Sequence, residues 1–225
     1  MGADGRVLLR DVTVRYGRRV ALEAVSGEFA SGSLTAVVGA NGAGKSTLLA
    51  AIAGVLRPAR GVVNCAAGRR LAYLPQLAAI DREYPLTVSE LIMLGGWREF
   101  GAFRSPGTAL RARAAASAET VGLAGRLGRP ISEISVGELQ RALFARLILQ
   151  DPAVVLLDEP FAAVDTPTMS VLLEQVMRWH QEGRTVIAVL HDLDLVQERF
   201  PLTLVLAQRC VAWGATEAAL PAMAA

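Results

Sequence analysis

The chain has 225 residues, of which 52% are hydrophobic and only 5% aromatic, and its formal net charge is +2. This length and composition favour one substantial domain with an aliphatic core. A charge so close to balance argues against a nucleic-acid partner or a membrane-surface helix. Cys65 and Cys210 stand far apart, a pattern that does not indicate a disulfide scaffold and that fits a reducing cytoplasm.

No stretch of the sequence approaches the ~18 uninterrupted apolar residues of a membrane-spanning helix. Asp4 and Arg6 interrupt the start of the chain before an apolar leader develops. We therefore expect neither a signal peptide nor a transmembrane segment. If the protein serves transport, the path through the membrane belongs to another chain.

Short apolar runs rich in β-branched residues predict the strands of a buried parallel sheet. These runs cover residues 34–39, 153–158, 185–190 and 203–206. Helical patterns lie between them, for example over 168–182, and this alternation predicts an α/β fold with helices on both faces of the sheet. Nearer the start, residues 7–14 alternate as an edge strand would, and another short strand is expected near residues 28–29.

Residues 77–150 differ from the rest because their apolar positions recur at helical spacing. The patterns Thr87 to Glu90 and Ser135 to Glu138 are capping boxes that mark helix starts. We predict a single domain spanning 1–225, in which an α/β core (1–76 and 151–225) carries residues 77–150 as an inserted helical subdomain.

The segment from Gly39 to Ser46 reads GANGAGKS and matches the phosphate-binding pattern GxxxxGK[ST], with a predicted strand before it and a helical run after it. Phosphate binding needs successive backbone N–H groups that point into one concavity, and Gly42 and Gly44 allow that backbone. The helix that begins near Lys45 adds its N-terminal partial positive charge.

Lys45 is the only lysine of the chain, and its ammonium would reach the β- and γ-phosphates of a bound nucleotide while the Ser46 hydroxyl ligates Mg²⁺. An ordinary glycine-rich turn is the alternative, which the pattern, its context and the single lysine together disfavour. The predicted ATP-binding residues of this segment are Gly39, Asn41, Gly42, Ala43, Gly44, Lys45, Ser46 and Thr47.

Two adjacent carboxylates, Asp158 and Glu159, follow the apolar run that begins at residue 153. Carboxylates at the carboxyl end of a buried strand are costly unless a cation or a polar network meets them. Asp158 is placed to hold Mg²⁺ opposite Ser46, and Glu159 to polarise the attacking water. Strands often end in Asp, so this pattern gains its weight from the phosphate loop.

Over roughly residues 6–215 the sequence resembles the nucleotide-binding subunits of ABC transporters. Tyr16 resembles the aromatic residue that stacks on adenine, Gln76 the glutamine that contacts Mg²⁺ and water, and His191 the switch histidine that holds the γ-phosphate. Asp165 occupies the place of the loop at the dimer interface. Taken singly, these residues have simpler readings as a surface or core aromatic, a loop residue, a structural histidine and a helix cap.

The family's signature motif reads LSGGQ, whereas residues 134–138 read ISVGE. The resemblance implies that Ser135, Val136, Gly137 and Glu138 face the ATP held by a second copy of the chain. Val136 places a β-branched side chain where the family has glycine. A displacement of an ångström at such a position is expected to change the rate by up to ~100-fold.

The resemblance implies a P-loop NTPase core with a parallel sheet, an N-terminal antiparallel β part and an inserted helical subdomain. ATP and Mg²⁺ are the implied ligands, and two copies would close head to tail on two ATP molecules and reopen after hydrolysis. The implied catalytic residues are Lys45, Gln76, Glu159 and His191, and the implied Mg²⁺ site is formed by Ser46, Gln76 and Asp158.

The implied partners are an integral-membrane permease, a second copy of the chain and, indirectly, a substrate-binding protein outside the membrane, with no nucleic acid. This places the chain at the cytoplasmic face of the membrane. Residues 74–97 and 204–220 resemble zinc and manganese uptake systems, so an importer motor for one of these metals is expected. Siderophore, haem or cobalamin uptake and a soluble ABC ATPase are the alternatives. The apolar face of residues 86–97 would form either a groove for the permease or simply the subdomain core.

Overall fold

The structure is a computed structural model that describes residues 5–68, 70–102, 104–162 and 164–223. The chain forms two compact units. The first contains the chain up to Pro75, Ala153–Pro160 and the chain from Arg178 onward, and the second contains Gln76–Pro152 and Phe161–Met177. No helix among the described residues has the length and apolar character needed to cross a bilayer.

The first unit is built on a six-stranded sheet. In spatial order its strands are β5 (Leu71–Leu74), β6 (Val154–Asp158), β7 (Thr185–Val189), β3 (Leu34–Val38), β8 (Leu202–Ala207) and β9 (Arg209–Ala215). The first five strands in this order, including β3, run parallel, whereas β9 pairs antiparallel with β8. Every residue of β3, β6 and β7 is buried, as expected of strands covered on both faces. The predicted buried parallel strands are thus confirmed.

A separate three-stranded antiparallel sheet of the same unit has the order β2 (Arg19–Phe29), β1 (Val7–Tyr16), β4 (Arg60–Cys65). The prediction that residues 7–14 form an edge strand is wrong, because β1 is the central strand and pairs on both sides. Its buried residues Val7, Leu9, Val12 and Val14 explain the apolar pattern. The pattern reports which residues face the core, but not how many neighbours a strand has.

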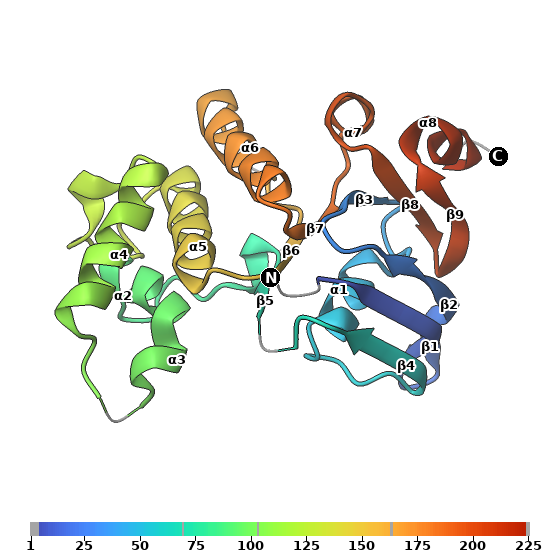
Figure 1. The fold of residues 1–225 in the computed structure, drawn as a ribbon, viewed down its shortest axis with the longest axis horizontal. Coiled ribbons are helices and arrows are strands. Elements are labelled where there is room, and N and C mark those ends of the chain that lie inside the picture. Colours follow the sequence, from blue (N-terminus) through green and yellow to red (C-terminus); the bar gives the residue numbers. More distant parts are fainter. Residues whose placement is uncertain (1–4, 69, 103, 163, 224–225) are drawn as a thin grey trace. The chain divides into compact units, whose positions relative to one another are not determined.

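Helix α1 (Lys45–Ile52) packs against strands of both sheets, and its residues Leu48, Leu49 and Ile52 belong to the core that they share. Figure 1 shows α7 (Leu193–Arg199) and α8 (Thr216–Ala219) on the opposite side of the six-stranded sheet. A 3₁₀ turn, η4 (Leu220–Met223), follows α8. The burial of α1 fixes the loop that precedes it, since that loop connects α1 to the central strand β3.

The second unit is helical (Figure 1). Its elements are η1 (Leu77–Ala79), α2 (Val88–Met93), η2 (Leu94–Gly96), α3 (Trp97–Phe100), α4 (Thr108–Thr120), η3 (Ala124–Arg126) and α5 (Val136–Gln150). α2, α4 and α5 pack together. A further helix, α6 (Thr166–Gln181), agrees with the helix predicted over 168–182 and continues from the second unit into the first.

Both predicted capping boxes are present. The Thr87 hydroxyl accepts a hydrogen bond from the N–H of Glu90, and the Ser135 hydroxyl accepts one from the N–H of Glu138. In each case the glutamate carboxylate in turn accepts a hydrogen bond from the backbone N–H of the capping residue. These bonds satisfy N–H groups that the helix itself leaves unpaired, so both helix starts are set by four consecutive residues.

Candidate nucleotide-binding site

The glycine-rich loop between β3 and α1 depends on close approaches of its backbone to other strands. Gly44 has a φ of 95° and precedes α1, and a Cβ there would collide with the carbonyl oxygen of Ala21. A Cβ on Gly39 would collide with the carbonyl oxygen of Leu206. The loop is thereby held as a tight turn whose following N–H groups stand at the start of α1, the arrangement that favours phosphate.

The Lys45 ammonium lies inside this loop. Lys45 is only 6% exposed. Its Nζ donates hydrogen bonds to the carbonyl oxygen of Gly39 at 2.7 Å and to that of Ala40 at 3.1 Å. Burial lowers the pKa of Lys45, whereas the neighbouring carboxylates of Glu159 and Asp158 act in the opposite direction. The ammonium is thus held by two neutral carbonyl oxygens of its own loop, and phosphate oxygens, which carry charge, would be stronger partners for it.

Asp158 ends β6 and is 2% exposed. Its Oδ1 accepts a hydrogen bond from the Ser46 hydroxyl at 3.0 Å. Burial raises the pKa of Asp158, and the bond from Ser46 partly offsets this. The hydroxyl and carboxylate oxygens are the hard donors that Mg²⁺ prefers, and a buried carboxylate is stabilised by a cation. Ser46 and Asp158 therefore fit a Mg²⁺ ion.

Tyr73 is a further residue of this site that the sequence analysis missed. Its hydroxyl hydrogen-bonds the carboxylate of Asp158, and burial, the largest cause, raises the pKa of Tyr73 to about 12. Tyr73 lies on β5 opposite Leu156 of β6, which brings it beside the end of that strand. Only the pairing of β5 with β6 creates this contact, so no local sequence pattern signals it.

Glu159 and His191 follow the ends of the adjacent strands β6 and β7. Glu159 has a φ of 53°, and its N–H donates to the carbonyl oxygen of Val189 at 3.2 Å. Its Oε1 lies 2.7 Å from Nε2 of His191. The side chains are 24% and 47% exposed, so both remain accessible to a substrate and to water.

The order of strands explains why these residues meet. β6, β7 and β3 are neighbours, and the residues at their carboxyl ends therefore converge on one edge of the sheet. Tyr16, at the end of β1, exposes 52% of its surface. Its ring is available to a ligand, and its predicted stacking on adenine stays a prediction.

The other predicted residues lie in the second unit, at or near helix starts. Gln76 is half-buried and precedes η1. Val136 is the first residue of α5, directly after the capping residue Ser135. A Cβ on Gly137 would lie 3.3 Å from the Thr168 hydroxyl, so glycine permits close packing there. Their predicted contacts with ATP stay predictions.

Asp165 precedes α6. Its carboxylate accepts a hydrogen bond from the N–H of Thr168 at 3.1 Å. Hydrogen bonds from the side chain of Thr168 and then from its backbone lower the pKa of Asp165. The simpler reading of this residue, a helix cap, is therefore confirmed. Its predicted place in a dimer interface stays a prediction.

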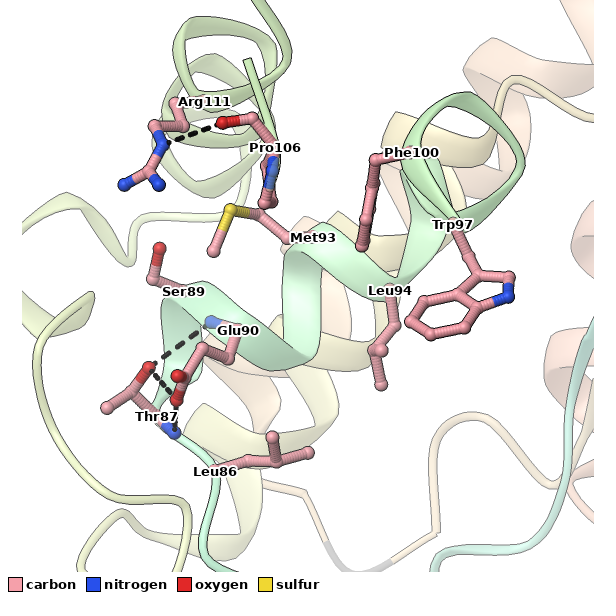
Figure 2. A pocket seen from close by; sticks show the side chains of 10 residues that line it. All are labelled: Leu86, Thr87, Ser89, Glu90, Met93, Leu94, Trp97, Phe100, Pro106 and Arg111. Carbon is pink, nitrogen blue, oxygen red and sulfur yellow. Dashed lines mark hydrogen bonds between the residues drawn. The ribbon is translucent and has the colours of Figure 1, made fainter. Parts of the chain in front are cut away.

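The second unit also contains a pocket of about 470 Å³ (Figure 2). Its apolar lining consists of Leu86, Met93, Leu94, Trp97, Phe100 and Pro106, and its polar lining of Thr87, Ser89, Glu90 and Arg111. Of the apolar residues predicted over 86–97, Val88, Leu91 and Ile92 are buried in the core. The core reading is confirmed for these three residues, and the groove for a permease stays a prediction.

A buried strand, a glycine-rich loop with a buried lysine, and carboxylates at the end of a neighbouring strand define a P-loop nucleotide-binding protein. Comparison with known proteins identifies the branch. Residues 22–162 match the ABC transporter family, and the chain belongs to this family as an ATP-binding, ATP-hydrolysing subunit.

The relatives cover nearly the whole chain. The zinc transport system ATP-binding protein TroB of Treponema pallidum is 37% identical over 95% of this chain and 82% of its own length. The manganese transport system ATP-binding protein MntB of Listeria monocytogenes is 34% identical over 93% of this chain and 90% of its own. A nucleotide-free ATP-binding cassette from an ABC transporter shares the fold, with a TM-score of 0.82, 22% identity and coverage of 96% and 94%.

Proposed function

We propose that this chain is the motor subunit of an importer for zinc or manganese and drives transport through a separate integral-membrane permease. The observation that carries the choice of metal is the identity of 37% and 34% to the zinc and manganese transport subunits over nearly the whole chain. The transported ion is bound elsewhere in the complex, and a substrate-binding protein delivers it to the permease. The motor then lies at the cytoplasmic face of the membrane.

In the proposed reaction, the loop from Gly39 to Thr47 holds the phosphates and the ring of Tyr16 stacks on adenine. Lys45 exchanges the carbonyls of its own loop for the β- and γ-phosphates. Ser46, Asp158 and Gln76 would hold Mg²⁺, and the bound ion would supply positive charge against the phosphate oxygens.

Glu159 orients the attacking water and accepts its proton. His191, which bonds Glu159 at 2.7 Å, holds the γ-phosphate and aligns it with that water. Phosphoryl transfer depends mainly on positioning and electrostatic stabilisation. The rigid ends of β6 and β7 supply the positioning, because both residues follow strands that are buried along their whole length.

The proposed cycle needs two copies. In this proposal the chain acts as a single domain whose core (1–76 and 151–225) carries the signature on an inserted subdomain (77–150). Ser135, Val136, Gly137 and Glu138 of one copy meet the ATP of the other, and Asp165 lies near the contact. The N-terminus of α5 favours an anion, so ATP closes the dimer and hydrolysis opens it.

The pocket lined by Leu94, Trp97 and Phe100 is the proposed contact for the permease. Leu94 and Trp97 are 39% and 48% exposed, and an aromatic, largely apolar pocket suits an apolar helix face. Residues at this pocket and at the signature belong to the same unit, so a permease bound there would move with the helix that meets ATP.

The test is transport by the purified chain reconstituted with its permease and binding protein in vesicles. We expect ATP-dependent uptake of zinc or manganese, lost in Glu159→Gln and retained in Glu23→Gln, an exposed control. Hydrolysis that needs Glu159 but is indifferent to the permease and to either metal would contradict the transport role and leave a soluble ATPase. Uptake of a metal chelate in place of the free ion would contradict the choice of substrate.

A further inference from the structure

The carboxylate of Glu138, in the first turn of α5, has two different partners. Oε2 accepts a hydrogen bond from the backbone N–H of Ser135 at 2.9 Å and so completes the capping box. Oε1 accepts one from Nε of Arg126 at 2.7 Å, which makes the pair a salt bridge. The Glu138 side chain is only 17% exposed and that of Arg126 is 44% exposed. Glu138 is thus partly withdrawn from water, whereas Arg126 lies at the surface.

The backbone around Arg126 is hydrogen-bonded on both sides. Its N–H donates to the carbonyl of Leu123 at 2.9 Å, and its carbonyl accepts from the N–H of Arg129 at 3.0 Å. The carbonyl of Leu127 accepts from the N–H of Ser89 at 2.9 Å, which fastens this loop to the start of α2. The guanidinium is therefore presented to Glu138 from an ordered backbone.

A carboxylate at this position creates an electrostatic problem. The signature motif that this segment resembles has glutamine here, which can make the same capping bond without a charge. The bond from the Ser135 backbone, followed by those from Arg126 and the Ser135 side chain, lowers the pKa of Glu138, so it is ionised at neutral pH. A fixed negative charge in the first turn opposes the anion that a helix N-terminus otherwise favours.

We propose that Arg126 is a positioning residue that neutralises Glu138, so that the start of α5 accepts the triphosphate held by a second copy of the chain. This inference rests on the proposed function, in which the signature meets the partner's ATP. Glu138 with Arg126 then replaces the neutral glutamine: the carboxylate keeps the capping bond, and the guanidinium removes its charge. Arg126 acts through Glu138 and is not itself assigned a contact with ATP.

A double-mutant cycle tests the pairing. Arg126→Ala, Glu138→Gln and the double variant are compared by hydrolysis in the full transporter and by ATP-driven dimerisation of chains that also carry Glu159→Gln. We expect Arg126→Ala to weaken both hydrolysis and dimerisation about tenfold, because the partly buried carboxylate of Glu138 loses its partner. In the background of Glu138→Gln, the same change is expected to have less than a twofold effect.

Arg129→Ala is the matched control, because it removes an equal charge from the same loop while leaving the Glu138 pair intact. If Arg129→Ala weakens hydrolysis and dimerisation as much as Arg126→Ala does, only the general charge of the loop matters. The pairing would also be overturned if Arg126→Ala still weakened hydrolysis and dimerisation about tenfold in the background of Glu138→Gln. Full activity of Arg126→Ala alone would overturn it as well. Thermal unfolding of each variant separates these outcomes from misfolding, and Arg126→Lys, which keeps the charge, is expected to recover most of the dimerisation.

The failure of this pairing can be told apart from the failure of the proposed function. Ser135→Arg places a bulky cation at the signature. If Ser135→Arg dimerises with ATP and hydrolyses it at the wild-type rate, the signature does not meet ATP and the proposed function fails. If Ser135→Arg is inactive while Arg126→Ala is unaffected, the proposed function stands and only the role of Arg126 is wrong.

Discussion

Glu159 and His191 are 32 residues apart in the chain, yet Oε1 and Nε2 lie 2.7 Å from each other. The contact follows from the register of two parallel strands, in which Asp158 lies opposite Val189. It also needs Glu159 at a φ of 53°, an uncommon conformation for a residue with a side chain. A strained backbone thus holds the glutamate that is proposed to activate water.

Glu159→Gln is expected to bind ATP and to dimerise with it, but to hydrolyse it at least about 100-fold more slowly, because an amide cannot accept the proton of the attacking water. Equilibrium binding of a fluorescent ATP analogue and phosphate release in single turnover measure the two effects. Hydrolysis at the wild-type rate would show that another residue activates the water.

Gly44→Ala is expected to unfold more easily than the wild type, by about 2 kcal/mol or more, and to lose ATP binding. The added Cβ collides with the carbonyl of Ala21 at a φ of 95°, so strain and overlap add. Gly54→Ala is the control: Gly54 has a φ of 74° and open space around it, so its expected cost is only about 1 kcal/mol. Urea unfolding measures the stability of both variants. Equal losses of stability would contradict the role of the close approach between Gly44 and the carbonyl of Ala21.

Tyr73→Phe is expected to destabilise the chain by about 1 kcal/mol, since Asp158 loses a hydrogen bond. It should also raise several-fold the Mg²⁺ concentration needed for half-maximal ATP binding, because an oriented ligand binds metal more tightly. Tyr84→Phe, at a residue 60% exposed, is the control. Unchanged Mg²⁺ dependence in Tyr73→Phe would restrict that tyrosine to a purely structural role.

Ser135→Ala and Thr87→Ala each remove the hydroxyl of a capping box, and each should cost about 1 kcal/mol of stability. Only Ser135→Ala is expected to lower the rate of ATP hydrolysis as well, because only α5 is proposed to meet the partner's ATP. Unfolding and steady-state hydrolysis are measured on the same preparations of the isolated chain, without a permease, because Thr87 also lines the pocket proposed for the permease. A matching fall in hydrolysis for Thr87→Ala would reduce the role of Ser135 to helix stability.

Much of the fold was predictable because its signals are local. The phosphate loop, the two capping boxes and the buried strands β3, β6 and β7 each depend on a few consecutive residues whose pattern has one favoured structure. The strands β4, β5 and β9 went unpredicted because they are short or alternate weakly. β1 was wrongly placed at an edge, since its second neighbour, β4, comes from a distant part of the chain.

The motifs alone were enough to identify the class of protein and its nucleotide chemistry, because backbone N–H groups, a lysine and carboxylates at that spacing have few other uses. Folding decided which side chains meet. Tyr73 bonds Asp158 only because β5 pairs with β6, Glu159 meets His191 only through the register of β6 with β7, and Arg126 reaches Glu138 only across a turn. Such contacts depend on strand order and on loop anchoring, which arise from the packing of the whole chain and have no signature in any short segment.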